Sequence, residues 1–143
     1  MKRNEARILY SKINAVLNSE AELGFNIVYA LTKTKNRMKT EVEEIGEILK
    51  KLQDEEKQLV LKYCETDDYG SPVIRDGKYC GLEDGINPEY DSKIREQMEK
   101  RFKYLNEDVD VSIHYINRDD IPQKGKAHIL DTLCYFIKDT DGN

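Results

Sequence analysis

The longest regular pattern in the chain is a series of apolar residues at intervals of seven. Five residues share one register, at Leu31, Met38, Ile45, Leu52 and Leu59. Val42 and Leu49 occupy companion positions, and no proline interrupts residues 26–63. Apolar residues at two positions of a heptad are typical of a helix that packs against another helix. The pattern therefore predicts one long, coiled-coil-like helix over about residues 26–63.

The length of this helix bears on its packing. At 1.5 Å per residue it would extend about 55 Å, which is more than a compact domain of this size requires. It must therefore project from the domain or pack against another helix along its length. One possibility is an internal hairpin with the first and last helices of the same chain. The other is a seam between protomers formed by the seven heptad residues, and we expect this seam to make the chain a homo-oligomer.

Three shorter patterns predict further helices. Apolar residues at helical spacing predict a helix over residues 3–17. Asn87 and Pro88 are a favourable N-cap and first residue for a helix over 88–105, with an apolar stripe at Ile94, Met98, Phe102 and Leu105. A last helix is expected over 121–137, with Cys134 in its buried face.

Two patterns predict strands. The Asp76-Gly77 pair suits a tight hairpin turn, so a hairpin is expected within residues 72–81. Apolar and polar residues alternate over 109–115, which predicts a one-sided strand in the same small antiparallel sheet. Together these patterns predict a single domain over 1–143 with a mainly α, α+β fold, in which two or three shorter helices pack on the long one.

The charge of the chain excludes some functions. Charged residues make up 36% of the chain and the net charge is −5. Residues 1–64 carry 12 basic and 10 acidic residues, whereas 65–143 carry 11 and 18. An acidic protein is not expected to bind nucleic acid directly. No apolar run is long enough for a membrane span or a signal peptide, and three cysteines without paired spacing favour the cytoplasm.

The residue types that usually carry catalysis do not form a recognisable motif. Cys64, Cys80 and Cys134 are candidate nucleophiles and His114 and His128 are candidate bases, but no spacing links a thiol to an imidazole. Metal-binding and phosphate-loop motifs are also absent from the sequence. We therefore expect a protein that is not an enzyme and has no catalytic residues, metal or cofactor.

Two clusters of charge are candidates for binding. The first, at Lys33, Lys35, Arg37 and Lys39, forms a ring around the long helix, because alternate residues do not share a helix face. This basic collar is either solvated or a contact for an acidic partner or phosphate. The second lies in connections between elements, at Asp67, Asp68, Tyr69, Glu83 and Asp84. Its carboxylates are either turn formers and solubilising charges or a partner-binding surface for a basic protein.

Three stretches of the chain resemble small uncharacterised proteins of tailed phages and prophages. They are Asn26–Met38, Glu41–Glu44 and Lys57–Tyr63, followed by a glycine-containing hairpin, an acidic helix and a segment like Val109–His114. The family supplies no catalytic residues. The resemblance implies a small accessory protein that acts by binding in the cytoplasm of an infected or lysogenic bacterial host.

Within that setting the leading hypothesis is an antagonist of a host defence system. Such a protein would bind a host protein with a basic surface, or hold a small anionic ligand between protomers. A virion-assembly accessory protein, acting as a scaffold or chaperone, is the first alternative. A small enzyme of an unrecognised class is the second.

Overall fold

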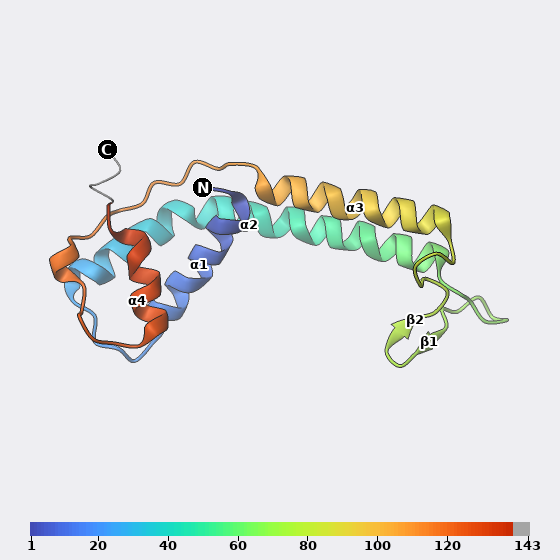
Figure 1. Cartoon of the computed structure of the whole chain (residues 1–143), viewed down its shortest axis with the longest axis horizontal. Coiled ribbons are helices and arrows are strands. Elements are labelled where there is room, and N and C mark those ends of the chain that lie inside the picture. The colour runs from blue at the N-terminus through green and yellow to red at the C-terminus, as the bar shows by residue number, and fades with distance from the viewer. Residues whose placement is uncertain (139–143) are drawn as a thin grey trace. The chain divides into compact units, whose positions relative to one another are not determined.

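A computed structural model of the chain describes residues 1–138 and has the expected mainly α, α+β fold (Figure 1). The order of elements is α1 (Arg3–Leu17), α2 (Phe25–Tyr63), β1 (Ile74–Arg75), β2 (Lys78–Tyr79), α3 (Pro88–Asn106), η1 (Arg118–Asp120), α4 (Ala127–Leu133) and η2 (Cys134–Phe136). The long helix, the first helix and the helix after Asn87 therefore form within one residue of their predicted bounds.

The chain divides into two compact units. Unit 1 comprises Met1–Ile45 and the chain from Glu107 onward, and unit 2 comprises Gly46–Asn106. The first part of α2 belongs to unit 1 and the second part to unit 2. The boundaries between the units therefore do not coincide with residue 64, where the balance of acidic and basic residues changes.

Unit 1 has a continuous apolar core. It combines one face of α1 with residues of α2, α4 and η2, and its largest fully buried side chain is Phe136. Leu31 and Met38 of the heptad series belong to this core. The first part of α2 therefore packs within the chain, against elements that the sequence places before and after it.

The prediction of a strand over 109–115 is wrong. Within residues 1–138 this segment pairs with no strand, and the N–H groups of Val109, His114 and the flanking Ile116 donate to three different places. Val109 N donates to Met1 O over 2.8 Å, His114 N donates to Thr34 Oγ1 over 2.9 Å, and Ile116 N donates to Phe136 O over 2.8 Å. The alternation still describes burial, because Val109, Val111 and Ile113 pack against the core of unit 1.

Thr34 gives the first test of this arrangement. Its side chain is fully buried and accepts the bond from His114 N. Thr34→Val keeps the branched shape but leaves that N–H without an acceptor, so the free energy of unfolding should fall by about 1–3 kcal/mol. Denaturant unfolding followed by circular dichroism measures the loss. Thr40→Val, at an exposed position of α2, is the control and should change the value by less than about 0.5 kcal/mol.

The predicted helix over 121–137 is wrong in its extent. The regular helix is α4, which has seven residues and is continued by η2. Pro122 and Gly125 precede it, and both residue types are unfavourable inside a helix. Cys134 is exposed, not buried as expected.

Unit 2 is built on an antiparallel pair of helices. The second part of α2 lies beside α3 (Figure 1), and contacts from Glu55 to Lys100 and from Tyr63 to Glu89 fix the antiparallel direction. The start of α3 is capped as the sequence predicts, since Asn87 Oδ1 accepts a bond from Tyr90 N over 3.2 Å.

A loop module over residues 64–87 joins these two helices. The predicted hairpin forms within it as β1 and β2, with Ile74 opposite Tyr79 and Arg75 opposite Lys78. Asp76 and Gly77 both have positive φ angles, of 52° and 75°, which is the geometry that favours Asp-Gly in a two-residue turn. The strands are only two residues long, so the sheet is smaller than predicted.

Candidate interaction surfaces

The heptad residues lie mainly inside the chain. Leu31, Met38, Ile45 and Leu52 are buried in the single chain, whereas Val42, Leu49 and Leu59 are half-buried. A buried side chain offers no surface to a second molecule. A seam between protomers would therefore have to use other side chains than the four buried ones.

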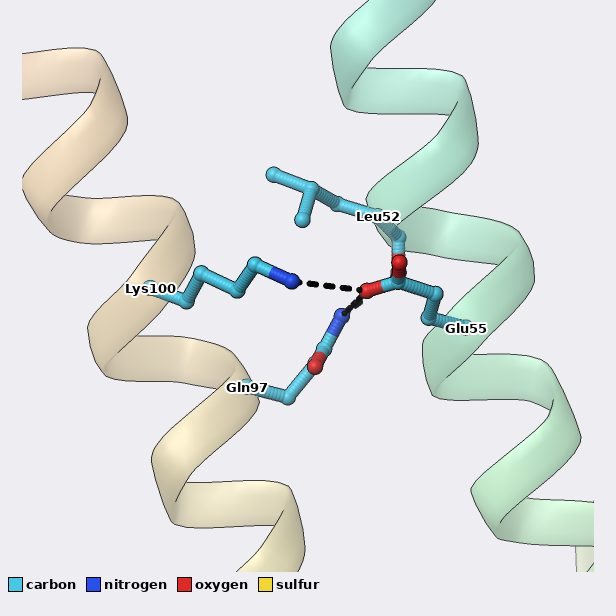
Figure 2. Close-up of polar contacts among 4 residues, drawn as sticks. All are labelled: Leu52, Glu55, Gln97 and Lys100. Atoms are coloured by element: carbon cyan, nitrogen blue, oxygen red, sulfur yellow. Dashed lines mark hydrogen bonds and ion pairs between the residues drawn. The ribbon is translucent and has the colours of Figure 1, made fainter.

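Polar contacts accompany the α2–α3 pair (Figure 2). Glu55 Oε2 accepts bonds from Gln97 Nε2 over 2.8 Å and from Lys100 Nζ over 3.2 Å, and Gln97 also donates to Leu52 O. The Gln97 bond, followed by the Lys100 bond, lowers the pKa of Glu55 below its usual value. Arg101 makes an ion pair with Glu56 over 2.8 Å. These contacts set the register of the two helices.

A second polar group holds the beginning of α3. The Tyr63 hydroxyl donates to Glu89 Oε1 over 2.8 Å, and this bond lowers the pKa of Glu89. Lys93 Nζ lies 3.6 Å from the same carboxylate and 5.7 Å from the centre of the Tyr63 ring. The rings of Tyr63 and Tyr90 are 6.0 Å apart. Tyr63, Glu89 and Lys93 are partners of one another, so we assign the group a structural role.

The acidic loop surface, defined by Asp67, Asp68, Tyr69, Glu83 and Asp84, is displayed on the loop module. All five residues are exposed. The module is held together by its backbone: Glu65 N donates to Cys80 O, Val73 N to Glu65 O, and Cys80 N to Val73 O, each over 2.9–3.0 Å. Within residues 1–138 no hydrogen bond or ion pair links Asp67, Asp68 or Tyr69 to Glu83 or Asp84. The backbone of one module therefore carries both parts of the surface, residues 67–69 and residues 83–84, without a hydrogen bond or ion pair between them.

Asp67 has a structural role in this surface. Its Oδ1 accepts bonds from Tyr69 N and Ser71 N, both over 2.9 Å. A carboxylate that bonds backbone N–H groups two and four residues ahead stabilises a turn. The turn-forming interpretation therefore holds for Asp67. By contrast, the side chain of Tyr69, which the turn displays, is 94% exposed.

Large apolar side chains accompany the acids on the module. Besides Tyr69, Ile74 is 55% exposed and Ile86 is 62% exposed. Isolated exposed apolar residues are ordinary, but here three of them occur on one loop module. The module thus presents apolar side chains among carboxylates.

The basic collar is divided between two faces of α2. Lys33 Nζ lies over the Tyr29 ring at 5.5 Å and donates to its hydroxyl over 3.3 Å. Arg37 donates to Ser112 Oγ over 3.3 Å. Lys35 is half-buried and Lys39 is exposed. The collar is therefore partly engaged by neighbours in unit 1.

An aromatic cluster that was not predicted from the sequence lies beside the collar. The rings of Phe25 and Tyr29 stack with centres 6.0 Å apart, and the rings of Tyr29 and His114 form a T-shaped pair with centres 5.1 Å apart. Phe25, Tyr29, Lys33 and Arg37 are spaced by four, so they form one stripe along α2. This spacing was present in the sequence and could have indicated the stripe, but the position of His114 depends on tertiary packing.

The candidate catalytic and metal-binding residues remain separate. Cys64 is buried with its Sγ near Leu61 O, Cys80 is half-buried and Cys134 is exposed. Across residues 1–138, no cysteine makes a hydrogen bond to His114 or His128. The same part of the chain holds no group of three or more His, Cys, Asp or Glu side chains arranged to bind a metal ion.

Among the helices of residues 1–138, none combines the length and the apolar character that crossing a membrane requires. Comparisons of the chain with protein-family models, with curated proteins and with solved structures found no match.

Proposed function

We propose that this is a noncatalytic binding protein whose acidic loop surface docks on a basic surface of another protein. The observation that carries the proposal is the exposure of Tyr69 on a hydrogen-bonded turn, with Asp68 beside it. Tyrosine is among the residues that most often anchor protein interfaces, because its ring is large and has few rotatable bonds. Carboxylates at the rim of such an anchor favour an Arg- or Lys-rich partner.

The order of the module supports this proposal. Binding through a mobile loop loses conformational entropy when the loop becomes fixed. Here the backbone bonds among Glu65, Val73 and Cys80, together with the Asp67 turn, hold the loop before any partner arrives. A fixed loop can present Tyr69 without that entropic loss, which favours a role in recognition.

The resemblance to phage and prophage proteins suggests the kind of partner. We propose an antagonist of a host defence protein that acts in the bacterial cytoplasm. The nucleic-acid groove of such a protein is rich in Arg and Lys, and an acidic surface could cover it. The acidic loop surface supplies the complementary charge.

The test reverses charge without breaking the turn. Asp68→Lys, Glu83→Lys and Asp84→Lys are combined, and Asp67 is kept because its carboxylate bonds two backbone N–H groups. The variant should remain folded, associate with the partner at least about 10-fold more slowly at low salt, and lose most of its salt dependence. Stopped-flow association kinetics at several salt concentrations measure the change.

The partner for this measurement is captured from a lysate of an infected or lysogenic bacterial host and is then purified. Glu43→Lys, Glu44→Lys and Glu47→Lys form the matched control, because they reverse three exposed carboxylates of α2 outside the module. Tyr69→Ala should weaken equilibrium binding by about 30-fold if the ring is the anchor. Equal kinetics for the loop variant and the control variant would contradict the proposal. Capture of capsid or tail proteins would favour the virion-assembly alternative.

A further inference from the structure

Unit 2 has very little buried apolar surface of its own. Among Gly46–Asn106 the buried apolar side chains are Leu52, Cys64 and Tyr90, whereas unit 1 has a core drawn from four helical segments and Ile116. Two helices side by side can bury only one face of each. Folding units with so small a core usually need a metal, disulfides or association with another chain. Cys64 and Cys80 of unit 2 are free thiols.

The exposed apolar residues of α3 form a stripe. Met98 is 59% exposed, Phe102 is 70% exposed, and Ile94 and Leu105 are half-buried at the two ends. Residues spaced by three or four lie on one side of a helix. Among the residues of α3 that bond to α2 are Glu89, Gln97, Lys100 and Arg101. The α3 stripe, defined as Ile94, Met98, Phe102 and Leu105, lies on an adjacent side of α3.

A groove runs along the α2–α3 pair next to this stripe. Its volume is about 560 Å³, and it is lined by Arg101 of α3, by Tyr79 of β2 and by five residues of α2: Gln53, Asp54, Glu56, Lys57 and Val60. Arg101 lies on the α2-facing side of α3 three residues from Met98, so the groove borders the stripe. The ion pair between Arg101 and Glu56 leaves neither charge free in the groove. A helix packed on the α3 stripe would therefore border this groove where Arg101 and Glu56 neutralise each other, with the charges of Asp54 and Lys57 elsewhere in the lining.

We propose that the α3 stripe is covered by the same stripe of a second copy of this chain. The two α3 helices would run antiparallel about a two-fold axis near Met98. Ile94 then faces Phe102 of the partner subunit, and Met98 faces Met98 of the partner subunit. With the accompanying segments of α2, the two helix pairs form a four-helix bundle, in which each pair supplies the apolar cover that the other lacks.

The charges beside the stripe favour a second copy as the occupant. Arg95 and Glu99 directly follow Ile94 and Met98, and both are exposed. Within residues 1–138 neither of them has an ion-pair partner. A two-fold axis near Met98 brings Arg95 close to Glu99 of the partner subunit, and symmetry repeats the pair on the other side. The surface is thus complementary to itself in both shape and charge.

The size of this surface sets the expected strength of the dimer. Helix α3 has 19 residues and is therefore about 28 Å long. A contact surface of that length, formed by α3 and the neighbouring part of α2, would bury roughly 600 Å² on each protomer. That area lies at the lower end of specific interfaces. We therefore expect a reversible dimer in the micromolar range.

Light scattering coupled to size exclusion tests the dimer with the whole chain. The measured mass of the wild type should rise with protein concentration from 16.7 kDa toward twice that value. Met98→Lys with Phe102→Lys should stay at the mass of one chain, with an unchanged circular dichroism spectrum because both side chains are exposed. Glu96→Ala with Lys103→Ala changes exposed residues on the other side of α3, and this control should dimerise like the wild type.

Charge reversal tests the antiparallel pairing. Arg95→Glu alone and Glu99→Arg alone should each weaken the dimer by about 5-fold or more, because like charges then meet across the two-fold axis. The double variant restores opposite charges and should recover most of the wild-type affinity. A wild type that stays at the mass of one chain at high micromolar concentration, or a dimer that the Met98→Lys, Phe102→Lys variant leaves intact, would overturn the proposal. Failure of the double reversal to recover affinity would overturn the proposed pairing.

Discussion

Phe136→Ala is expected to lower the free energy of unfolding by about 3–5 kcal/mol. The ring is fully buried in the core of unit 1, and it belongs to η2, whose Phe136 O accepts the bond from Ile116 N. Removing the ring leaves a cavity among the residues of α1, α2 and α4. Because small domains are stable by only about 5–15 kcal/mol, much of the total would be lost. Denaturant unfolding of both proteins, followed by circular dichroism, measures the difference.

Tyr135→Ala is the matched control, since it removes an aromatic ring from the adjacent residue. Tyr135 is 47% exposed, and its recorded ring contact is with Lys12, whose Nζ lies 5.4 Å from the ring centre. An exposed contact of this kind contributes about 0.5–1 kcal/mol. The loss for Tyr135 should therefore be several times smaller than the loss for Phe136. Equal losses would mean that Phe136 does not form the centre of the core of unit 1.

The helices that the sequence predicted well have local signals at their ends. The Asn87-Pro88 pair begins α3 because the Asn87 side chain accepts the Tyr90 N–H and proline needs no such acceptor. The hairpin turn is equally local, as Asp76 and Gly77 adopt the positive φ angles that their residue types favour. Interactions between residues a few positions apart can be inferred from the sequence without knowledge of the fold.

The segment over 109–115 shows where this reasoning fails. Its alternation correctly indicated which side chains are buried. A strand, however, also needs a neighbouring strand, and the acceptors of Val109, His114 and Ile116 are Met1, Thr34 and Phe136, which are distant in sequence. Side-chain periodicity reports burial but carries no information about which backbone groups will be near.

The candidate surfaces were predicted in the same partial way. Loop position and charge indicated the exposure of Asp68 and Tyr69. They did not distinguish Asp67, whose carboxylate stabilises the turn, from the acids that are available to a partner. The apolar spacing of α3 indicated the stripe but not what covers it. Whether a helix covers Met98 and Phe102 depends on the fold, and in the single chain both side chains are exposed.

Ile45→Lys distinguishes the two interpretations of the heptad series. If Ile45 lay in a seam between protomers, the variant would be a folded monomer, since the lysine would only separate the chains. The side chain is instead 1% exposed within one chain. A lysine there would be buried without a partner, and we expect it to reduce the free energy of unfolding by about 3–5 kcal/mol.

The measurement compares helix content and unfolding at a concentration low enough for the wild type to be monomeric. Ile45→Lys should unfold at much lower denaturant than the wild type, or lose helical signal without denaturant. Glu44→Lys introduces the same side chain at the preceding, exposed position and should remain within about 0.5 kcal/mol of the wild type. A stable, fully helical Ile45→Lys monomer would return the heptad to the role of a seam between chains. Loss of the fold would mean that Ile45 stabilises the single chain. Association between chains would then use side chains outside the buried heptad positions, such as Met98 and Phe102 on α3.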